Sequence, residues 1–101
     1  MQTLQAAQLK NTNSNVFYTE MATKCWVRLG GTFSSQTVTM EESTDNSTFA
    51  TFTTDATNQA FTVPTYKLYD LPGGIYFRFA VSNGGTPSID SAVAGTGVKL
   101  V

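Results

Sequence analysis

Residues 75–82 constrain the fold of this chain more than any other segment, because apolar and mixed side chains alternate across all eight positions. The apolar positions are Ile75, Phe77, Phe79 and Val81. A period of two places alternate side chains on opposite faces of a β-strand, whereas a helix requires a period near 3.6. The segment therefore predicts a strand at the centre of a sheet, with one face turned to the core.

Shorter runs of β-forming residues, separated by turn residues, occur along most of the remaining chain. In residues 24–29, Cys25, Val27 and Leu29 form the apolar side of an alternating run that ends at two glycines. Other runs occupy residues 16–21, 36–42, 48–53, 59–63, 66–69, 89–93 and 97–101. No crossover helix is visible to connect parallel strands, so the strands should pair antiparallel. We therefore predict an all-β fold, an antiparallel, jelly-roll- or Ig-like β-sandwich of about seven or eight short strands.

The first 15 residues lack such a pattern. Leu4, Ala7 and Leu9 could form a short helical or extended segment, and residues 10–15 are a polar run whose Asn and Ser side chains compete for backbone hydrogen bonds. We expect residues 1–15 to form an N-terminal arm that becomes ordered on a partner. Residues 16–101 should then form a single sandwich domain, since a chain of 101 residues is too short for two independent cores.

Charge and hydropathy argue against nucleic acid and membrane as partners. Six Lys and Arg against seven Asp and Glu give a net charge of -1, which lacks the positive field that phosphate-backbone binding requires. No apolar run is long enough to cross a bilayer. The first ten residues also lack the basic and apolar regions of a secretion signal, so synthesis in a host cytoplasm is expected.

The same inventory argues against catalysis and bound metal. The chain has no His and one Cys, so neither a Ser-His nor a Cys-His pair can form, and a structural zinc site lacks ligands. Cys25 alternates with Val27 and Leu29 and should be a buried, unreactive thiol. We expect no enzyme activity and no cofactor.

The side of the strands opposite the core carries the candidate contact residues. Trp26 and Arg28 on one strand, and Tyr76 and Arg78 on another, all point away from the predicted apolar face. Trp, Tyr and Arg are enriched at the energetic centres of protein interfaces, so we predict an interface there. Two alternatives remain open: these side chains could cover the second face of the sheet beneath the arm or a loop, or form a platform on which a sugar stacks.

Three segments carry a resemblance to a known class of protein. They are Gly31-Thr32-Phe33 with residues 36–45, the aromatic run 49–52, and the turn Leu71-Pro72-Gly73-Gly74 leading into a strand that has Arg78 between apolar residues. This order of strands and turns resembles small structural proteins of tailed-phage virions, of the capsid decoration or cement type. The resemblance implies a β-sandwich that binds the outside of a capsid lattice, often as a trimer, with its N-terminal segment gripping neighbours.

Together these features predict a non-enzymatic virion structural protein that stabilises a phage head. Its expected partners are the major capsid protein or other virion proteins and further copies of itself. Its expected location is the capsid surface, after assembly in the host cytoplasm. The predicted contacts are Trp26, Arg28, Tyr76 and Arg78, with Leu4 and Leu9 of the arm. The alternative is a carbohydrate-binding or host-recognition module of a tail or fibre, which requires Trp26 or a Tyr exposed in a groove.

Overall fold

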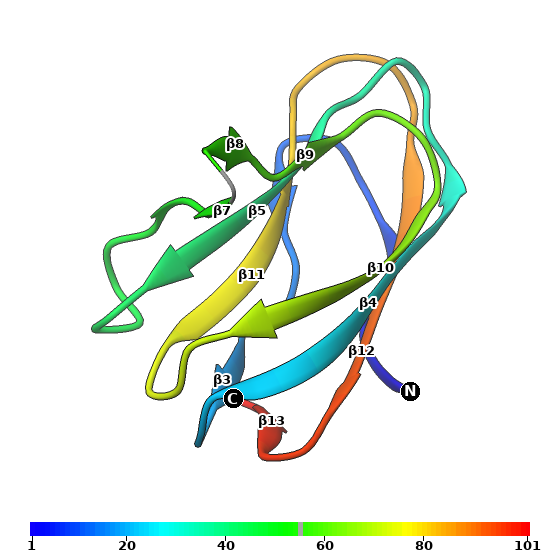
Figure 1. Ribbon diagram of the computed structural model, residues 1–101. Helices are drawn as coiled ribbons and strands as arrows, with labels where there is room; N and C mark the ends of the chain where they lie inside the picture. Colours follow the sequence, from blue (N-terminus) through cyan, green and yellow to red (C-terminus); the bar gives the residue numbers. More distant parts are fainter. Residues whose placement is uncertain (55) are drawn as a thin grey trace.

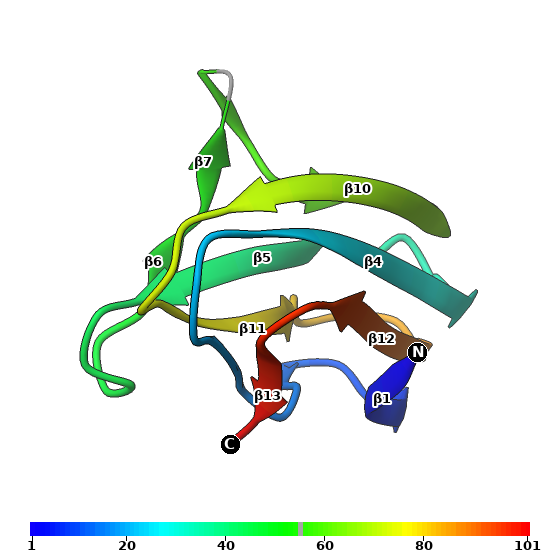
Figure 2. The same cartoon turned by 60° about the horizontal axis from the view of Figure 1, so that its bottom comes forward.

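The computed structural model describes residues 1–54 and 56–101, and two sheets pack face to face in it (Figure 1, Figure 2). The four-stranded sheet has the order β1 (Gln2–Gln8), β12 (Ser88–Gly95), β4 (Thr23–Thr32) and β10 (Thr65–Leu71). The second sheet has the order β13 (Val98–Leu100), β3 (Phe17–Thr19), β11 (Tyr76–Val81), β5 (Val38–Ser43) and β6 (Ala50–Thr51); β2 (Thr12–Asn13) also pairs with β11, and β9 (Ala60–Phe61) with β5. β7 (Thr53–Thr54) and β8 (Thr57–Asn58) form a separate hairpin. Every described pairing is antiparallel, so the predicted all-β sandwich is confirmed.

The core is built from the alternating runs that the sequence displays. β11 lies between β3 and β5, as expected of a central strand, and buries Phe77 and Phe79 completely. Both rings stack against Phe17 of β3, with centroids 5.3 and 6.4 Å away. From the four-stranded sheet, the apolar side of β4 closes the core with Cys25, Val27 and Leu29.

The turn between β10 and β11 carries the chain from one sheet to the other, and it requires both of its glycines. A Cβ atom on Gly73 would lie 2.8 Å from the backbone of Met21 and Ala22, closer than real Cβ contacts allow. Gly74 has a φ of +77°, a left-handed conformation that side chains disfavour. The turn therefore packs closely against Met21 and Ala22, in the segment that connects β3 of the second sheet with β4 of the four-stranded sheet.

The N-terminal segment is not an arm, and that prediction is wrong. Residues Gln2–Gln8 form β1, which pairs with β12 and completes the four-stranded sheet. Leu4 is 1% exposed and belongs to the core, while the Gln8 amide nitrogen donates to the Phe79 carbonyl across the sandwich at 3.1 Å. The sandwich domain therefore begins at β1 rather than at residue 16.

Cys25 is fully buried, as its alternation predicted, and burial raises the pKa of its thiol from 9.0 to about 11 despite a hydrogen bond from the Ala94 backbone. Burial likewise raises the pKa of Tyr69 from 10.0 to about 12. Above pH 9.0 the unfolded chain therefore binds fewer protons than the folded chain, so stability should fall as pH rises toward 11. Denaturant unfolding on either side of pH 9.0 measures this, and Cys25→Ala should reduce the slope.

The reactivity of the same thiol provides a control for this prediction. In the folded protein the thiol should react with a disulfide reagent far more slowly than in the unfolded chain, because it is both protonated and inaccessible. Equal reaction rates in the folded and unfolded states, or a stability that does not change across this pH range, would contradict the burial of Cys25.

Candidate binding surface

The structure separates the four strand residues that the sequence placed on one surface. Trp26 and Arg28 lie on β4 of the four-stranded sheet, whereas Tyr76 and Arg78 lie on β11 of the other sheet. All four point away from the core, as predicted. Because the two sheets pack face to face, their outer faces point in opposite directions, and the expected single surface does not exist.

The outer face of the four-stranded sheet exposes an aromatic and aliphatic cluster. Trp26 is 41% exposed, and its ring lies edge-on to Tyr66 of β10 with centroids 4.6 Å apart. Leu68 of β10 is also 41% exposed and lies directly opposite Trp26, while Ala94 of β12 lies opposite on the other side. We call the surface formed by Trp26, Arg28, Tyr66 and Leu68 the Trp26 face.

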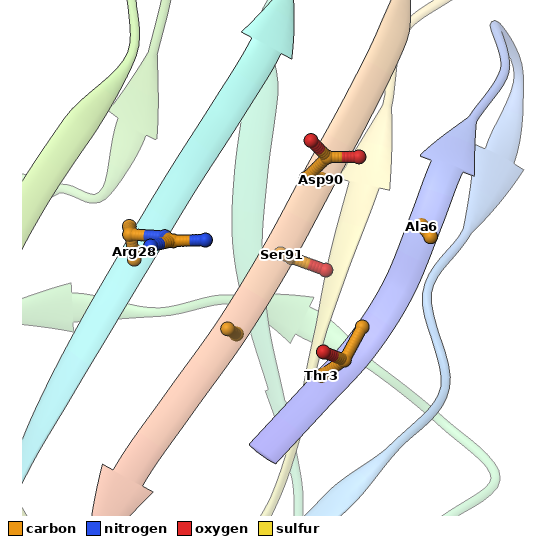
Figure 3. A pocket seen from close by; sticks show the side chains of 6 residues that line it. Thr3, Ala6, Arg28, Asp90 and Ser91 are labelled. Carbon is orange, nitrogen blue, oxygen red and sulfur yellow. The ribbon is translucent and has the colours of Figure 1, made fainter. Parts of the chain in front are cut away.

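A shallow hollow of about 240 Å³ adjoins the Trp26 face over β12, between β1 and β4 (Figure 3). It is lined by Thr3, Ala6, Arg28, Asp90, Ser91 and Ala92. Asp90 accepts a hydrogen bond from the Ala7 backbone N–H through Oδ1 at 3.1 Å. Arg28 has no ion pair within residues 1–54 and 56–101, so its guanidinium is available to a ligand or partner. The face thus combines apolar rings with one uncommitted cation.

On the opposite outer face, the side chains of Tyr76 and Arg78 contact other residues of the same domain. Tyr76 packs on Tyr18 with ring centroids 4.7 Å apart. The Arg78 Nε donates to Glu41 Oε1 at 2.7 Å, and its guanidinium lies 3.9 Å above the centroid of the Phe49 ring. Arg78 therefore holds the loop after β5 against the sheet. These contacts within the domain account for the position of its side chain, so no partner is needed to explain it.

The carboxylate of Asp45 closes the loop after β5, which Arg78 also contacts. Asp45 Oδ1 accepts hydrogen bonds from the Ser43 hydroxyl and from the backbone N–H groups of Ser47 and Thr48, at 2.8 to 2.9 Å. The Thr48, Ser43 and Ser47 hydrogen bonds lower the pKa of Asp45 below its usual value. This arrangement stabilises a turn. Among the described residues, no group of three or more His, Cys, Asp or Glu side chains is placed to hold a metal ion.

The two leucines expected on the arm have different fates. Leu4 is a core residue and cannot be a contact, because β1 inserts it between the sheets. Leu9 follows β1 and is 60% exposed, beside a second hollow of about 320 Å³ whose other lining residues are Lys10, Gly85, Thr86 and Pro87. Leu9 therefore remains a candidate contact.

Sequence reasoning missed Tyr66 and Leu68 as members of the exposed cluster. The signal was the alternation of Tyr66, Leu68 and Asp70 with Lys67, Tyr69 and Leu71. Lys67 obscured it, since a charged residue in the inward set breaks the apolar pattern. In the structure, the Lys67 Nζ donates to Gln59 Oε1 at 3.1 Å.

Comparison with family models, with curated proteins and with solved structures found no match for this chain. In the described part of the chain, no helix is long and apolar enough to span a membrane.

Proposed function

We propose that this chain is a non-enzymatic structural protein of a phage virion, of the capsid decoration type, which attaches to the head through the Trp26 face. The exposed Trp26–Tyr66 pair beside the unpaired Arg28 is the observation that carries the proposal. A soluble domain gains nothing from leaving these rings in water, whereas burial of Trp, Tyr and Arg supplies most of the binding energy in many interfaces.

The geometry of the Trp26 face fits a broad protein partner. Its residues lie on the outer side of a continuous sheet, and small Ala92 and Ala94 side chains on β12 leave the aromatic cluster accessible from that side. The ion pair between Lys24 and Asp70, 2.9 Å long and well exposed, lies at one margin of the cluster. An apolar centre with charged groups at its margin is the usual anatomy of a protein interface.

Replacement of Trp26 by Ala should weaken attachment to heads at least about 30-fold, the loss typical of a central aromatic contact. Heads assembled without the chain would be mixed with wild-type or variant protein, and binding measured by co-sedimentation and by the melting temperature of the shell. Tyr76→Ala is the matched control, because Tyr76 is an aromatic residue on the opposite outer face and should leave binding unchanged.

Two outcomes would argue against attachment through this face. Wild-type protein that neither binds heads nor raises their melting temperature would remove the capsid as the partner. Equal losses of binding in Trp26→Ala and Tyr76→Ala would remove the Trp26 face as the contact, since the two residues lie on opposite sides of the sandwich.

Carbohydrate recognition is the second candidate, and the hollow beside Arg28 is the observation that favours it. An aromatic ring can stack on the apolar face of a sugar, while Arg28, Asp90 and Thr3 surround a space that could hold one sugar unit and offer hydrogen bonds to its hydroxyls. Binding to a glycan array that is lost in both Trp26→Ala and Arg28→Ala, without binding to heads, would identify this function instead.

A further inference from the structure

The two sheets leave four edges, and three of them are unsuited to pairing with another strand. β1 has two register shifts along its pairing with β12. β13 has three residues, and β6 and β9, which share one edge, have two residues each. Bulges and short strands are the usual means by which proteins prevent edge-to-edge association.

β10 is the exception, because it is a long and regular strand at the edge of its sheet (Figure 2). All seven residues of Thr65–Leu71 pair in unbroken register with β4 on one side, and no strand of the described chain pairs with the other side. Tyr66 and Leu68 are exposed on its outer face. A regular edge strand of this length that exposes two apolar side chains is a template for a further strand.

The charged residue in the middle of β10 does not guard this edge. Lys67 is drawn back toward its own domain, where its Nζ bonds to Gln59 and lies 4.9 Å from the centroid of the Tyr69 ring. Gln59 Oε1 also accepts the Tyr69 hydroxyl hydrogen bond at 2.7 Å, so the same amide holds both side chains. The amine is therefore directed along the inner side of the sheet.

We propose that two copies of the chain pair β10 with β10, antiparallel about a two-fold axis, and so join their sheets into one eight-stranded sheet. The sequence of β10 is complementary to itself when the axis passes at Leu68. That register places Leu68 opposite the partner subunit's Leu68, and Tyr66 opposite the partner subunit's Asp70, whose carboxylate can accept the tyrosine hydroxyl.

The charges on β10 exclude two of the alternative registers. The pairing of Leu68 with its own copy favours the axis at Leu68 over an axis at Tyr66 or Tyr69, where no like charges are opposed either. With the axis at Leu68, Lys67 faces the partner subunit's Tyr69, and no like charges are opposed. Moving the axis to Lys67 or to Asp70 would place two lysines or two aspartates directly opposite each other, which destabilises strand pairing. A two-fold pairing also closes on itself, so it yields a dimer rather than the trimer that the resemblance implies.

The pairing would place two Trp26 faces side by side on one continuous surface. Two linked faces bind at a high effective concentration, so a contact that is weak for one copy becomes strong for the dimer. This consequence rests on the proposed attachment to heads. The pairing itself does not, and it is measured on the isolated protein.

Sedimentation equilibrium of the purified chain over a wide concentration range tests the pairing. Wild-type protein should be a dimer that dissociates on dilution, and Leu68→Lys, which opposes two ammonium groups at the axis, should raise the dissociation constant at least about tenfold. Leu100→Lys is the matched control, because Leu100 is a similarly exposed leucine, 43% against 41%, on the edge strand of the other sheet. It should leave the dimer intact.

Hydrogen exchange locates the contact: the β10 amides that point away from β4 should be protected in concentrated wild-type protein and lose that protection on dilution or in Leu68→Lys. A wild-type monomer or trimer would overturn the pairing, as would a dimer that Leu68→Lys does not weaken. Head binding by a monomeric chain would refute the pairing and leave the proposed function intact, and a dimer that fails to bind heads would do the reverse.

Discussion

Replacing Phe77 with Ala is expected to lower the free energy of unfolding by about 3 to 5 kcal/mol. Phe77 is fully buried at the centre of the second sheet, and its ring contacts Phe17 and Phe52 at centroid distances of 5.3 and 5.4 Å. Truncation removes the buried area of the ring and leaves a cavity between two aromatic neighbours that the sheets hold in place. A domain of this size has about 5 to 15 kcal/mol of stability in total, so the variant should be close to unfolding.

Urea unfolding, followed by the fluorescence of Trp26, measures this loss. Tyr76→Ala is the adjacent control: the same strand loses an aromatic side chain, but from the outer face, where the contact with Tyr18 accounts for only about 1 kcal/mol. Similar shifts of the unfolding midpoint in the two variants would mean that β11 does not turn its phenylalanines into the core.

The alternation in residues 75–82 allowed this part of the fold to be predicted correctly. A period of two determines which side chains share a face, so the burial of Phe77, Phe79, Cys25 and Val27 follows from the sequence. Gly73-Gly74 and Gly84-Gly85 placed breaks between strands for a similar local reason. These features depend on neighbouring residues only, and they need no knowledge of which strands lie side by side. The expected break at Gly30-Gly31 is wrong, because β4 continues through both glycines to Thr32, where they pair with β12.

The predicted surface failed because it depended on sheet membership, which alternation does not encode. Trp26 and Tyr76 both point away from the core, but alternation within a strand does not say which of the two sheets that strand joins. In the structure, their strands β4 and β11 belong to different sheets. Tyr66 joins Trp26 only because β10 pairs with β4 in the register that sets Leu68 opposite Trp26. Such long-range pairing is decided by the whole fold, so residues distant in sequence could not be grouped in advance.

The N-terminal segment was misjudged for a different physical reason. In β1 one apolar residue, Leu4, enters the core, and the other inward position is occupied by Gln8, whose amide nitrogen donates to the carbonyls of Thr12 and Phe79. The two bulges opposite β12 also interrupt the period of two. A bulged edge strand with a buried amide has the composition of a loop, although backbone pairing with β12 makes it part of the sheet.

Leu4→Ala distinguishes a strand from an arm, and it should cost about 2 to 5 kcal/mol of unfolding free energy. Leu4 is 1% exposed, whereas Leu9, five residues later, is 60% exposed, so Leu9→Ala should change stability by no more than about 0.5 kcal/mol. Denaturant unfolding of both variants in isolation measures the difference. Small and equal losses of unfolding free energy in the two variants would mean that the segment is a free arm. A large loss confined to Leu4→Ala would mean that the segment contributes to folding, and that its capacity to grip a neighbouring subunit is limited to the exposed residues around Leu9.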